Sequence, residues 1–395
     1  MIPELLAPAG NLEKLKVVVS YGADAVYLGG KNQFGLRAAS ENFTEEELLE
    51  AVHLCHQNNV KVYVVLNSFF HNKEIHQLPL YLDFLESIKV DAVIVSDLGV
   101  VELINSHCSI PIHLSTQSSC LNSYSAQFWK SRGVERIVLG REVSLDEAQK
   151  IREQTDIELE MFVHGSMCMA YSGNCVISNY TSGRDSNRGG CAHSCRFEYE
   201  LEDNGKKVTD TFMSSKDLFG LRLLKQYQKA GIASLKIEGR NKGPLYAGTI
   251  TKVYSDALKV IKKGEELTEK LIEQWEDELK KVSHRDYTEA SLVQKASNDS
   301  IYHQREESNR EYDVVGLVAD VVENEFIVIE VRKKFQKGET LEVLPFNGPI
   351  HELMASQLLL MDSQEIEFTN PGGLVKVPYI PNIAVNNIVR KRANI

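Results

Sequence analysis

Short apolar runs alternate with longer amphipathic segments through the first 240 residues of the chain. The runs are rich in Val, Ile and Leu and end in turn or polar residues, a pattern typical of buried parallel strands. The segments between them, such as residues 44–59, have the apolar spacing of helices that cover a sheet. Eight runs follow this pattern, at residues 4–10, 25–30, 61–67, 92–97, 112–117, 136–141, 159–165 and 234–240. We therefore predict an α/β fold, a TIM-like (β/α)8 barrel, over residues 1–262.

The spacing of these strands is regular except between the seventh and the eighth. Residues 164–230 form an insertion there, and it carries four cysteines. Active sites of TIM barrels are built from the loops that follow the C-terminal ends of the strands. We therefore expect the cysteine-rich insertion to lie at the mouth of the barrel, beside the chemistry.

A different pattern begins after the barrel. Residues 241–264 predict the eighth helix, and residues 263–310 a further helical segment with a polar linker from residue 285. From 311 to 395, short apolar runs separated by turn residues predict a small, barrel-like, all-β domain. We expect strands in it at 313–322, 325–334, 339–346, 358–368 and 375–380. Its basic residues are compatible with RNA contact and equally with protection of edge strands: Arg332, Lys333, Lys334, Lys337, Arg390, Lys391 and Arg392.

The alternation of residues along the predicted strands indicates which side chains point into the barrel. In the eighth strand, Lys236, Glu238 and Arg240 share the polar face. Charged groups inside a barrel cost free energy unless they pair or bind a ligand. A buried ion pair between Glu160 and Lys236 is therefore the alternative to a ligand contact, and His113 is expected to be a core histidine. The candidate catalytic residues are His164, Lys236, Glu238 and Arg240, and the candidate substrate-binding residues, at the ends of three strands, are Asn67, Gln117 and Arg141.

Composition and charge narrow the class of protein. The 395 residues are 43% hydrophobic and 25% charged, as in ordinary globular proteins. No apolar stretch is long enough to span a membrane and the first residues lack the features of a leader, so we expect a cytoplasmic protein with reduced thiols. The net charge of −11 argues against a general nucleic-acid coat, although residues 201–242 carry nine Lys and Arg against five acids.

The four cysteines of the insertion indicate a metal centre. Cys168, Cys175, Cys191 and Cys195 have the spacing C-x6-C-x15-C-x3-C, whereas structural zinc sites use two tight C-x2-4-C pairs. Glycine and serine fill the loop between them, which lets backbone amides approach the sulfurs. The spacing favours an iron-sulfur cluster over zinc, with zinc as the alternative. We expect the other three cysteines to be small buried or helix-face residues: Cys55, Cys108 and Cys120.

Several longer motifs resemble those of peptidase family U32, the collagenase-like proteins. They are LLAPAG at 5–10, GADAVYLG at 22–29, FVHGSMCMAYSGNCVIS at 162–178, NRGGCAHSCR at 187–196 and SLKIEGRNKGPLYAGTITKVY at 234–254. Together they span the predicted barrel. The resemblance implies a 4Fe-4S cluster held by the four cysteines of the insertion.

The resemblance also implies an activity. Members of the family are similar to oxygen-independent hydroxylases, and the length of this chain and its single β domain resemble the type that converts the tRNA wobble uridine to 5-hydroxyuridine with prephenate as hydroxyl donor. The implied partners are a tRNA anticodon loop and this small dicarboxylate, with Arg141, Lys236 and Arg240 as its cationic contacts. Bases of the loop would stack on aromatic residues, for which Phe34, Tyr171 and Tyr180 are candidates, although each is also an ordinary packing residue.

Other functions remain open at this stage. They are a peptidase, a hydroxylase of rRNA cytidine or of a quinone precursor, and a zinc-stabilised binding module. The sequence contains neither HExxH nor GxSxG, the usual motifs of zinc and serine hydrolases. The oligomeric state is not predicted.

Overall fold

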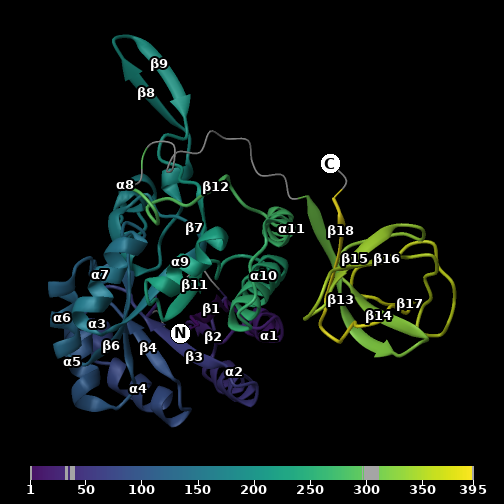
Figure 1. Ribbon diagram of the computed structural model, residues 1–395, viewed down its shortest axis with the longest axis horizontal. Coiled ribbons are helices and arrows are strands. Elements are labelled where there is room, and N and C mark those ends of the chain that lie inside the picture. The colour runs from purple at the N-terminus through teal and green to yellow at the C-terminus, as the bar shows by residue number, and fades with distance from the viewer. Residues whose placement is uncertain (1, 32–33, 36–40, 296, 298–310, 394–395) are drawn as a thin grey trace.

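The barrel is closed, as the sequence predicts. The computed structural model describes residues 2–31, 34, 35, 41–295, 297 and 311–393. Parallel strands follow one another in the order β1 to β7, and β11 closes the barrel by pairing with both β7 and β1 (Figure 1). All eight predicted barrel strands are confirmed: β1 (Glu4–Pro8), β2 (Ala25–Leu28), β3 (Lys61–Leu66), β4 (Ala92–Val95), β5 (Ile112–Leu114), β6 (Val134–Val138), β7 (Glu158–Ser166) and β11 (Ser234–Ile237).

Helices cover the outside of the barrel (Figure 1). A capping box fixes the start of α2: the Glu47 amide donates to Thr44 Oγ1, and the Thr44 amide donates to Glu47 Oε2. No helix in the described ranges combines the length and apolar character of a membrane span. The helices around the barrel are α1 (Leu12–Ser20), α2 (Glu45–Gln57), α3 (Asn72–Ile75), α4 (Leu78–Ser87), α5 (Leu98–His107), α6 (Ser123–Ser131), α7 (Leu145–Thr155), α9 (Leu224–Lys229) and α10 (Pro244–Lys262).

The interior of the barrel has an apolar side and a charged side. Strands β1 to β4 supply the apolar cluster Leu6, Ala25, Tyr27, Tyr63, Val65, Ala92 and Ile94. On the charged side, Lys236 Nζ lies 2.8 Å from Glu160 Oε1, and Arg136 Nη1 lies 3.5 Å from Glu160 Oε2. Glu160 is fully buried. The alternative of a buried Glu160–Lys236 ion pair is therefore confirmed.

His113 is the core histidine that the sequence predicts. It is buried, and its ring meets the ring of Tyr63 edge to face at 4.6 Å. Burial, together with the nearby positive charge of Arg136, lowers the pKa of His113 to about 3, so the imidazole is neutral near neutral pH.

The insertion between β7 and β11 is an ordered cap on the barrel. It contains α8 (Ile177–Ser182), a hairpin of β8 (Tyr199–Asp203) and β9 (Lys206–Asp210), and β10 (Asp217–Phe219). The hairpin projects away from the body of the molecule, and β10 pairs antiparallel with the end of β7 (Figure 1). The predicted linker at 285–310 lies partly outside the described residues, but its start forms β12 (Tyr287–Thr288), which pairs with β10.

A curved, six-stranded antiparallel sheet forms the C-terminal domain. Its order is β16-β15-β18-β13-β14-β17. The predicted strand at 358–368 is wrong: Ser363, with φ of 71°, folds the segment back, and the Ile366 amide donates to the Leu358 carbonyl. The strands are β13 (Tyr312–Val322), β14 (Phe326–Val331), β15 (Thr340–Leu344), β16 (His351–Met354), which the sequence analysis missed, β17 (Leu374–Pro378) and β18 (Ile388–Arg392).

The C-terminal domain is docked on the barrel through α1, α10 and α11 (Glu269–Lys280). The Tyr21 hydroxyl donates to the Leu344 carbonyl at 2.7 Å and accepts from the Ile388 amide at 3.0 Å. A Cβ at Gly248 would lie 2.8 Å from Ile388 Cδ1, so glycine permits this close approach. Arg390, fully buried, joins the two parts by an ion pair of 2.5 Å with Glu278 of α11. The interface therefore combines apolar packing with a buried charge pair.

Candidate functional site

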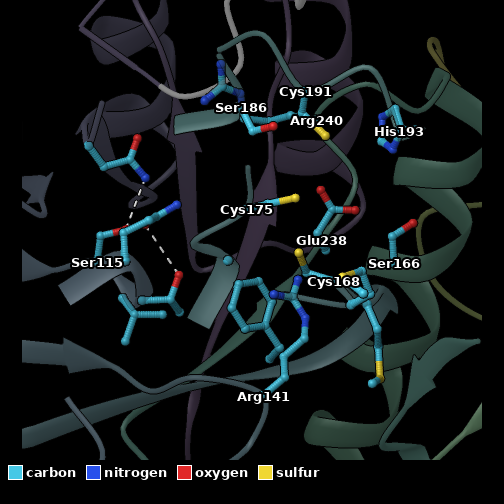
Figure 2. Close-up of a pocket in the computed structure, with 18 of the residues that line it drawn as sticks. Ser115, Arg141, Ser166, Cys168, Cys175, Ser186, Cys191, His193, Glu238 and Arg240 are labelled. Carbon is cyan, nitrogen blue, oxygen red and sulfur yellow. Dashed lines mark hydrogen bonds between the residues drawn. The ribbon is translucent and has the colours of Figure 1, made fainter. Parts of the chain in front are cut away.

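All four cysteines of the insertion line one cavity at the C-terminal ends of the barrel strands. The cavity has a volume of about 180 Å³, and residues of the insertion form much of its lining. Figure 2 shows Cys168, Cys175 and Cys191 with Glu238 and Arg141 around this space. The prediction that the cysteine-rich insertion lies at the barrel mouth is confirmed.

The turn between Cys168 and Cys175 is held by the barrel loop that follows β6. The Ser172 amide donates a short hydrogen bond to the Glu142 carboxylate, and the Ser172 hydroxyl lies 3.4 Å from the same group. Ser172 has φ of 48°, an unfavourable conformation for a residue with a side chain. The Glu142 contact offsets this cost and fixes the position of the turn.

A second barrel loop, the one after β3, holds the other side of the insertion. The Phe69 amide donates to the Asn187 carbonyl at 3.0 Å, and Arg188 Nη2 lies 2.7 Å from Glu74 Oε1. The Asn187 side chain in turn donates to the carbonyl of Cys175 at 3.1 Å. The backbone of Cys175 is thus tied to the barrel through a chain of polar contacts.

Helix α8 positions the last two cysteines. Ser178 Oγ accepts from the Ala192 amide at 3.1 Å, directly after Cys191. Thr181 Oγ1 donates to Ser194 Oγ at 2.7 Å, directly before Cys195. Ser178 and Thr181 both reach this turn because residues at i and i+3 of a helix share one face.

The sulfur atoms lie among groups that suit thiolate ligands. The Ile177 amide donates to Cys175 Sγ at 3.4 Å. Burial raises the pKa of Cys168, partly offset by the Ala170 amide and by Arg141, and burial raises the pKa of Cys195, partly offset by Arg196. Amide donors and cations both stabilise negative charge on sulfur, as a metal-bound thiolate requires.

The spacing of the thiols does not form a site for a single ion. Within the part of the chain that the structure describes, no three His, Cys, Asp or Glu side chains converge closely enough to hold one metal ion. A single zinc ion draws its sulfur ligands to about 2.3 Å from one centre, whereas a 4Fe-4S cluster binds each thiolate at a different iron. Four cysteines around one cavity, with an amide donor and cations beside them, fit the cluster better than the ion.

Three of the candidate catalytic residues line this cavity: Lys236, Glu238 and Arg240. Lys236 lines the cavity although it is paired with Glu160, and its Nζ lies 4.5 Å from the centre of the Tyr27 ring. Arg240 is buried and donates to Asn42 Oδ1 at 2.6 Å. Glu238 is the only carboxylate among the described lining residues.

The three candidate substrate-binding residues also line the cavity. Arg141 stacks on Phe162, with its Cζ 3.7 Å from the ring centre. Asn67 Nδ2 donates to Ser115 Oγ at 3.1 Å, and the Ser115 hydroxyl donates a short hydrogen bond to Gln117 Oε1 (Figure 2). The cavity is therefore lined both by a cation stacked on a ring and by a row of linked polar side chains.

His164, the fourth candidate catalytic residue, lies elsewhere. It is buried outside the set of residues that line the cavity, and its Nδ1 is 3.2 Å from the Tyr254 hydroxyl. Its ring also contacts Phe219, Tyr246 and Tyr287. Burial lowers the pKa of His164 to about 3. The strand alternation that placed it inward did not take account of β10 and α10, which enclose its side chain.

Sequence reasoning missed several residues of the site. Arg196 and His193 line the cavity beside Cys195, and their position next to a cysteine was the available signal. Arg285, from the predicted linker, supports the lining residue Ser166 from behind: its Nη2 lies 3.1 Å from both Asp217 Oδ1 and Ser166 Oγ. No local pattern pointed to Arg285, because the contact joins segments far apart in the sequence.

Comparison with known proteins agrees with this architecture. The profile of peptidase family U32 matches residues 10–302, and the profile of the U32 C-terminal domain matches residues 310–390. The tRNA hydroxylation protein P1 of Bacillus subtilis is 38% identical, over 98% of this chain and 94% of that protein. A 23S rRNA 5-hydroxycytidine synthase of Escherichia coli is 37% identical over 65% of this chain and 39% of its own length. The Collagenase of Porphyromonas gingivalis is 31% identical over 72% of each chain. Because the first profile covers well over half of its residues, the chain belongs to peptidase family U32.

Proposed function

We propose that this protein is an enzyme that hydroxylates RNA, and that its substrate is the wobble uridine of tRNA, which it converts to 5-hydroxyuridine. The observation that carries the proposal is the cavity at the barrel mouth, where four cysteines meet cations and a carboxylate. The relative named for tRNA hydroxylation covers nearly the whole chain, including both domains. The relative named for rRNA modification shares about two thirds of the chain. An activity on tRNA would place the protein in the cytoplasm.

We propose that the four cysteines hold a 4Fe-4S cluster. When bound, such a cluster supplies one-electron redox chemistry. The residues of the chain do the rest: Glu142 and Asn187 fix the loops that carry the cysteines.

We further propose prephenate as the hydroxyl donor. A dicarboxylate needs cations, and Arg141, Arg196 and Arg240 all line the cavity. Guanidinium groups bind carboxylates through two parallel hydrogen bonds, so they fix orientation as well as charge. Glu238, the carboxylate in the described lining, is our candidate for the base that takes the proton from C5, while the hydroxyl group of the donor bonds to C5 and the electron pair of the broken donor C–O bond stays with the donor.

Nucleoside mass spectrometry tests the substrate and the reaction together. Deleting the gene from its host should abolish 5-hydroxyuridine in purified tRNA and leave the nucleosides of rRNA unchanged. Loss of 5-hydroxycytidine from rRNA instead would assign the rRNA activity, and no change in either RNA would refute RNA hydroxylation. Cleavage of gelatin that persists after iron is removed would support a peptidase, the activity that the name of the Porphyromonas gingivalis relative indicates.

A further inference from the structure

Exposed apolar side chains lie in the insertion that carries the four cysteines. Tyr171 and Tyr180 are 61% and 88% exposed, although aromatic rings are usually buried at least in part. Three more exposed side chains lie in the same segment, so that five residues form what we call the mouth platform: Met169, Tyr171, Val176, Tyr180 and Phe197. Exposed aromatic rings beside a ligand cavity are candidates for stacking on an unpaired base.

The platform is tied directly to the cysteines. Met169 follows Cys168, and Val176 follows Cys175. Tyr171 precedes Ser172, whose amide is held by Glu142, and Tyr180 lies on α8, whose Ser178 and Thr181 contact the turn at Ser194. The exposed rings therefore stand on anchored backbone, which reduces the entropy lost when a partner binds.

The chemistry of the platform favours single-stranded RNA over protein. In the sequence, the exposed polar residues Asn174 and Asn179 stand between its apolar residues, and three of the five are aromatic. Residues 167–197 carry three arginines against one aspartate in a chain of net charge −11, although Arg188 is paired with Glu74. Exposed aromatic rings with local positive charge are the features that bind unstacked bases and phosphates.

The cavity behind the platform limits what can enter. A cavity of about 180 Å³ is far too small for a base-paired duplex, so only an unpaired base can enter it. We infer that the mouth platform stacks the bases next to the target uridine of an RNA loop, so that the target base alone is turned into the cavity. This inference rests on the proposed function and adds the surface that recognises the RNA. Enzymes that modify a base commonly take it out of its stack in this way.

The other aromatic and basic candidates are engaged elsewhere. Phe34 is buried and stacks on Phe70 with ring centres 5.5 Å apart, so it is a packing residue. Most basic residues of the C-terminal domain are in ion pairs with acidic groups: Arg332 with Glu13, Lys333 with Asp313, Lys337 with Glu365, Arg390 with Glu278 and Glu342, and Lys391 with Glu339. The domain docks on the barrel and has little spare positive charge for phosphates.

The insertion also offers a basic residue for the phosphate backbone. Arg184 is exposed just after α8, close in sequence to Tyr180. On the projecting hairpin, by contrast, Lys207 is paired with Glu200 and Glu202. We therefore expect Arg184 to contact a phosphate of the bound strand.

Binding of a uridine-containing RNA stem-loop tests the inference. The probe carries 2-aminopurine beside the loop uridine, because this base loses fluorescence when it stacks. Tyr180→Ala and Tyr171→Ala, in the full-length protein prepared without air, should each weaken binding roughly 5- to 100-fold, the range for loss of one stacked base. Tyr180→Trp should retain binding and quenching. Phe368→Ala, an exposed aromatic of the C-terminal domain, is the matched control and should bind like wild type.

The outcomes separate this inference from the proposed function. If the wild-type protein binds the stem-loop and both alanine variants bind it with the same affinity, the role of the platform is overturned and RNA hydroxylation still stands. Wild-type protein that binds no RNA would overturn both. A change of oligomeric state in Tyr180→Ala, seen by sedimentation without a change in RNA affinity, would show that the platform contacts a second copy. Arg184→Gln should weaken binding and reduce its salt dependence by about one ion.

Discussion

Replacing Glu160 by Gln should strongly destabilise the barrel. Glu160 is fully buried, and its carboxylate lies 2.8 Å from Lys236 Nζ and 3.5 Å from Arg136 Nη1. Burial alone would raise the pKa of Glu160, but these two cations outweigh burial and hold it below its usual value. Glutamine keeps the shape of the side chain and removes the charge that the two cations share.

The size of the effect follows from what each cation retains. Arg136 keeps Glu4, at 2.7 Å, and Glu158, at 2.8 Å, whereas Lys236 loses its nearest carboxylate. A buried charge left without its partner costs about 3–5 kcal/mol. Replacing both members of the pair, Glu160→Gln with Lys236→Met, should recover most of the lost free energy of unfolding, because Lys236 no longer leaves an uncompensated charge.

Urea unfolding followed by tryptophan fluorescence measures this cost. Trp129 on α6 and Trp275 on α11 report on the barrel and its attached helix. The matched control is Glu147→Gln on α7, whose partner Lys150 lies 2.5 Å away with both side chains more than half exposed. The control should cost under about 0.5 kcal/mol. A cost below about 1 kcal/mol for Glu160→Gln, or a double variant no more stable than the single one, would refute the reasoning.

Three further predictions follow from other parts of the molecule. Arg390→Met leaves two glutamates of the domain interface without their cation and should lower the free energy of unfolding by about 3–5 kcal/mol; normal protease resistance of the C-terminal domain would contradict this. The folded-state pKa of His113 is about 3, below its ordinary 6.5, so the unfolded chain takes up the proton first, and stability should fall with pH from about 6.5 toward 3. His113→Gln should flatten that slope by up to about 1.4 kcal/mol per pH unit, as urea midpoints across this range will show. Glu142→Ala releases the Ser172 turn and should lower the iron retained after anaerobic gel filtration, whereas Glu142→Gln should retain more; equal iron in both would remove Glu142 as a positioning residue.

The barrel was predictable because its determinants are local. Each strand is a short apolar run, and each helix between strands carries its own apolar stripe, as α2 does with its capping residues Thr44 and Glu47. Alternation within β11 likewise placed Lys236 on the inner face. The pairing of Glu160 with Lys236 was foreseen as one of two alternatives, because neighbouring strands bring such residues together.

The predictions that failed concern features that depend on contacts between distant segments. The segment 358–368 has the composition of a strand, but a turn at Ser363 folds it back on itself. His164 has the alternation of an inward residue, yet β10 and α10 surround it with aromatic rings. Arg285 joins the site from over 100 residues beyond the first cysteine, and no local pattern foretells such a contact.

The cysteine site was predictable in part. Their spacing predicted a metal centre and its place at the mouth, but the anchoring of their loops by Glu142 and Asn187 became visible only in three dimensions. The bound cluster, the hydroxyl donor and the roles of the lining residues stay predictions. Each one concerns the same cavity, so one experiment on that cavity tests them together.

Complementation of a deletion strain with single cysteine variants tests the central claim most directly. Cys175→Ser removes a thiol that lines the cavity, and Cys108→Ser, on the outside of the barrel beyond α5, is the matched control. The measured quantity is 5-hydroxyuridine in purified tRNA, with iron content determined on each protein. We predict that Cys108→Ser restores the modified nucleoside and binds iron like wild type, whereas Cys175→Ser does neither. Full restoration of 5-hydroxyuridine by Cys175→Ser would contradict the account.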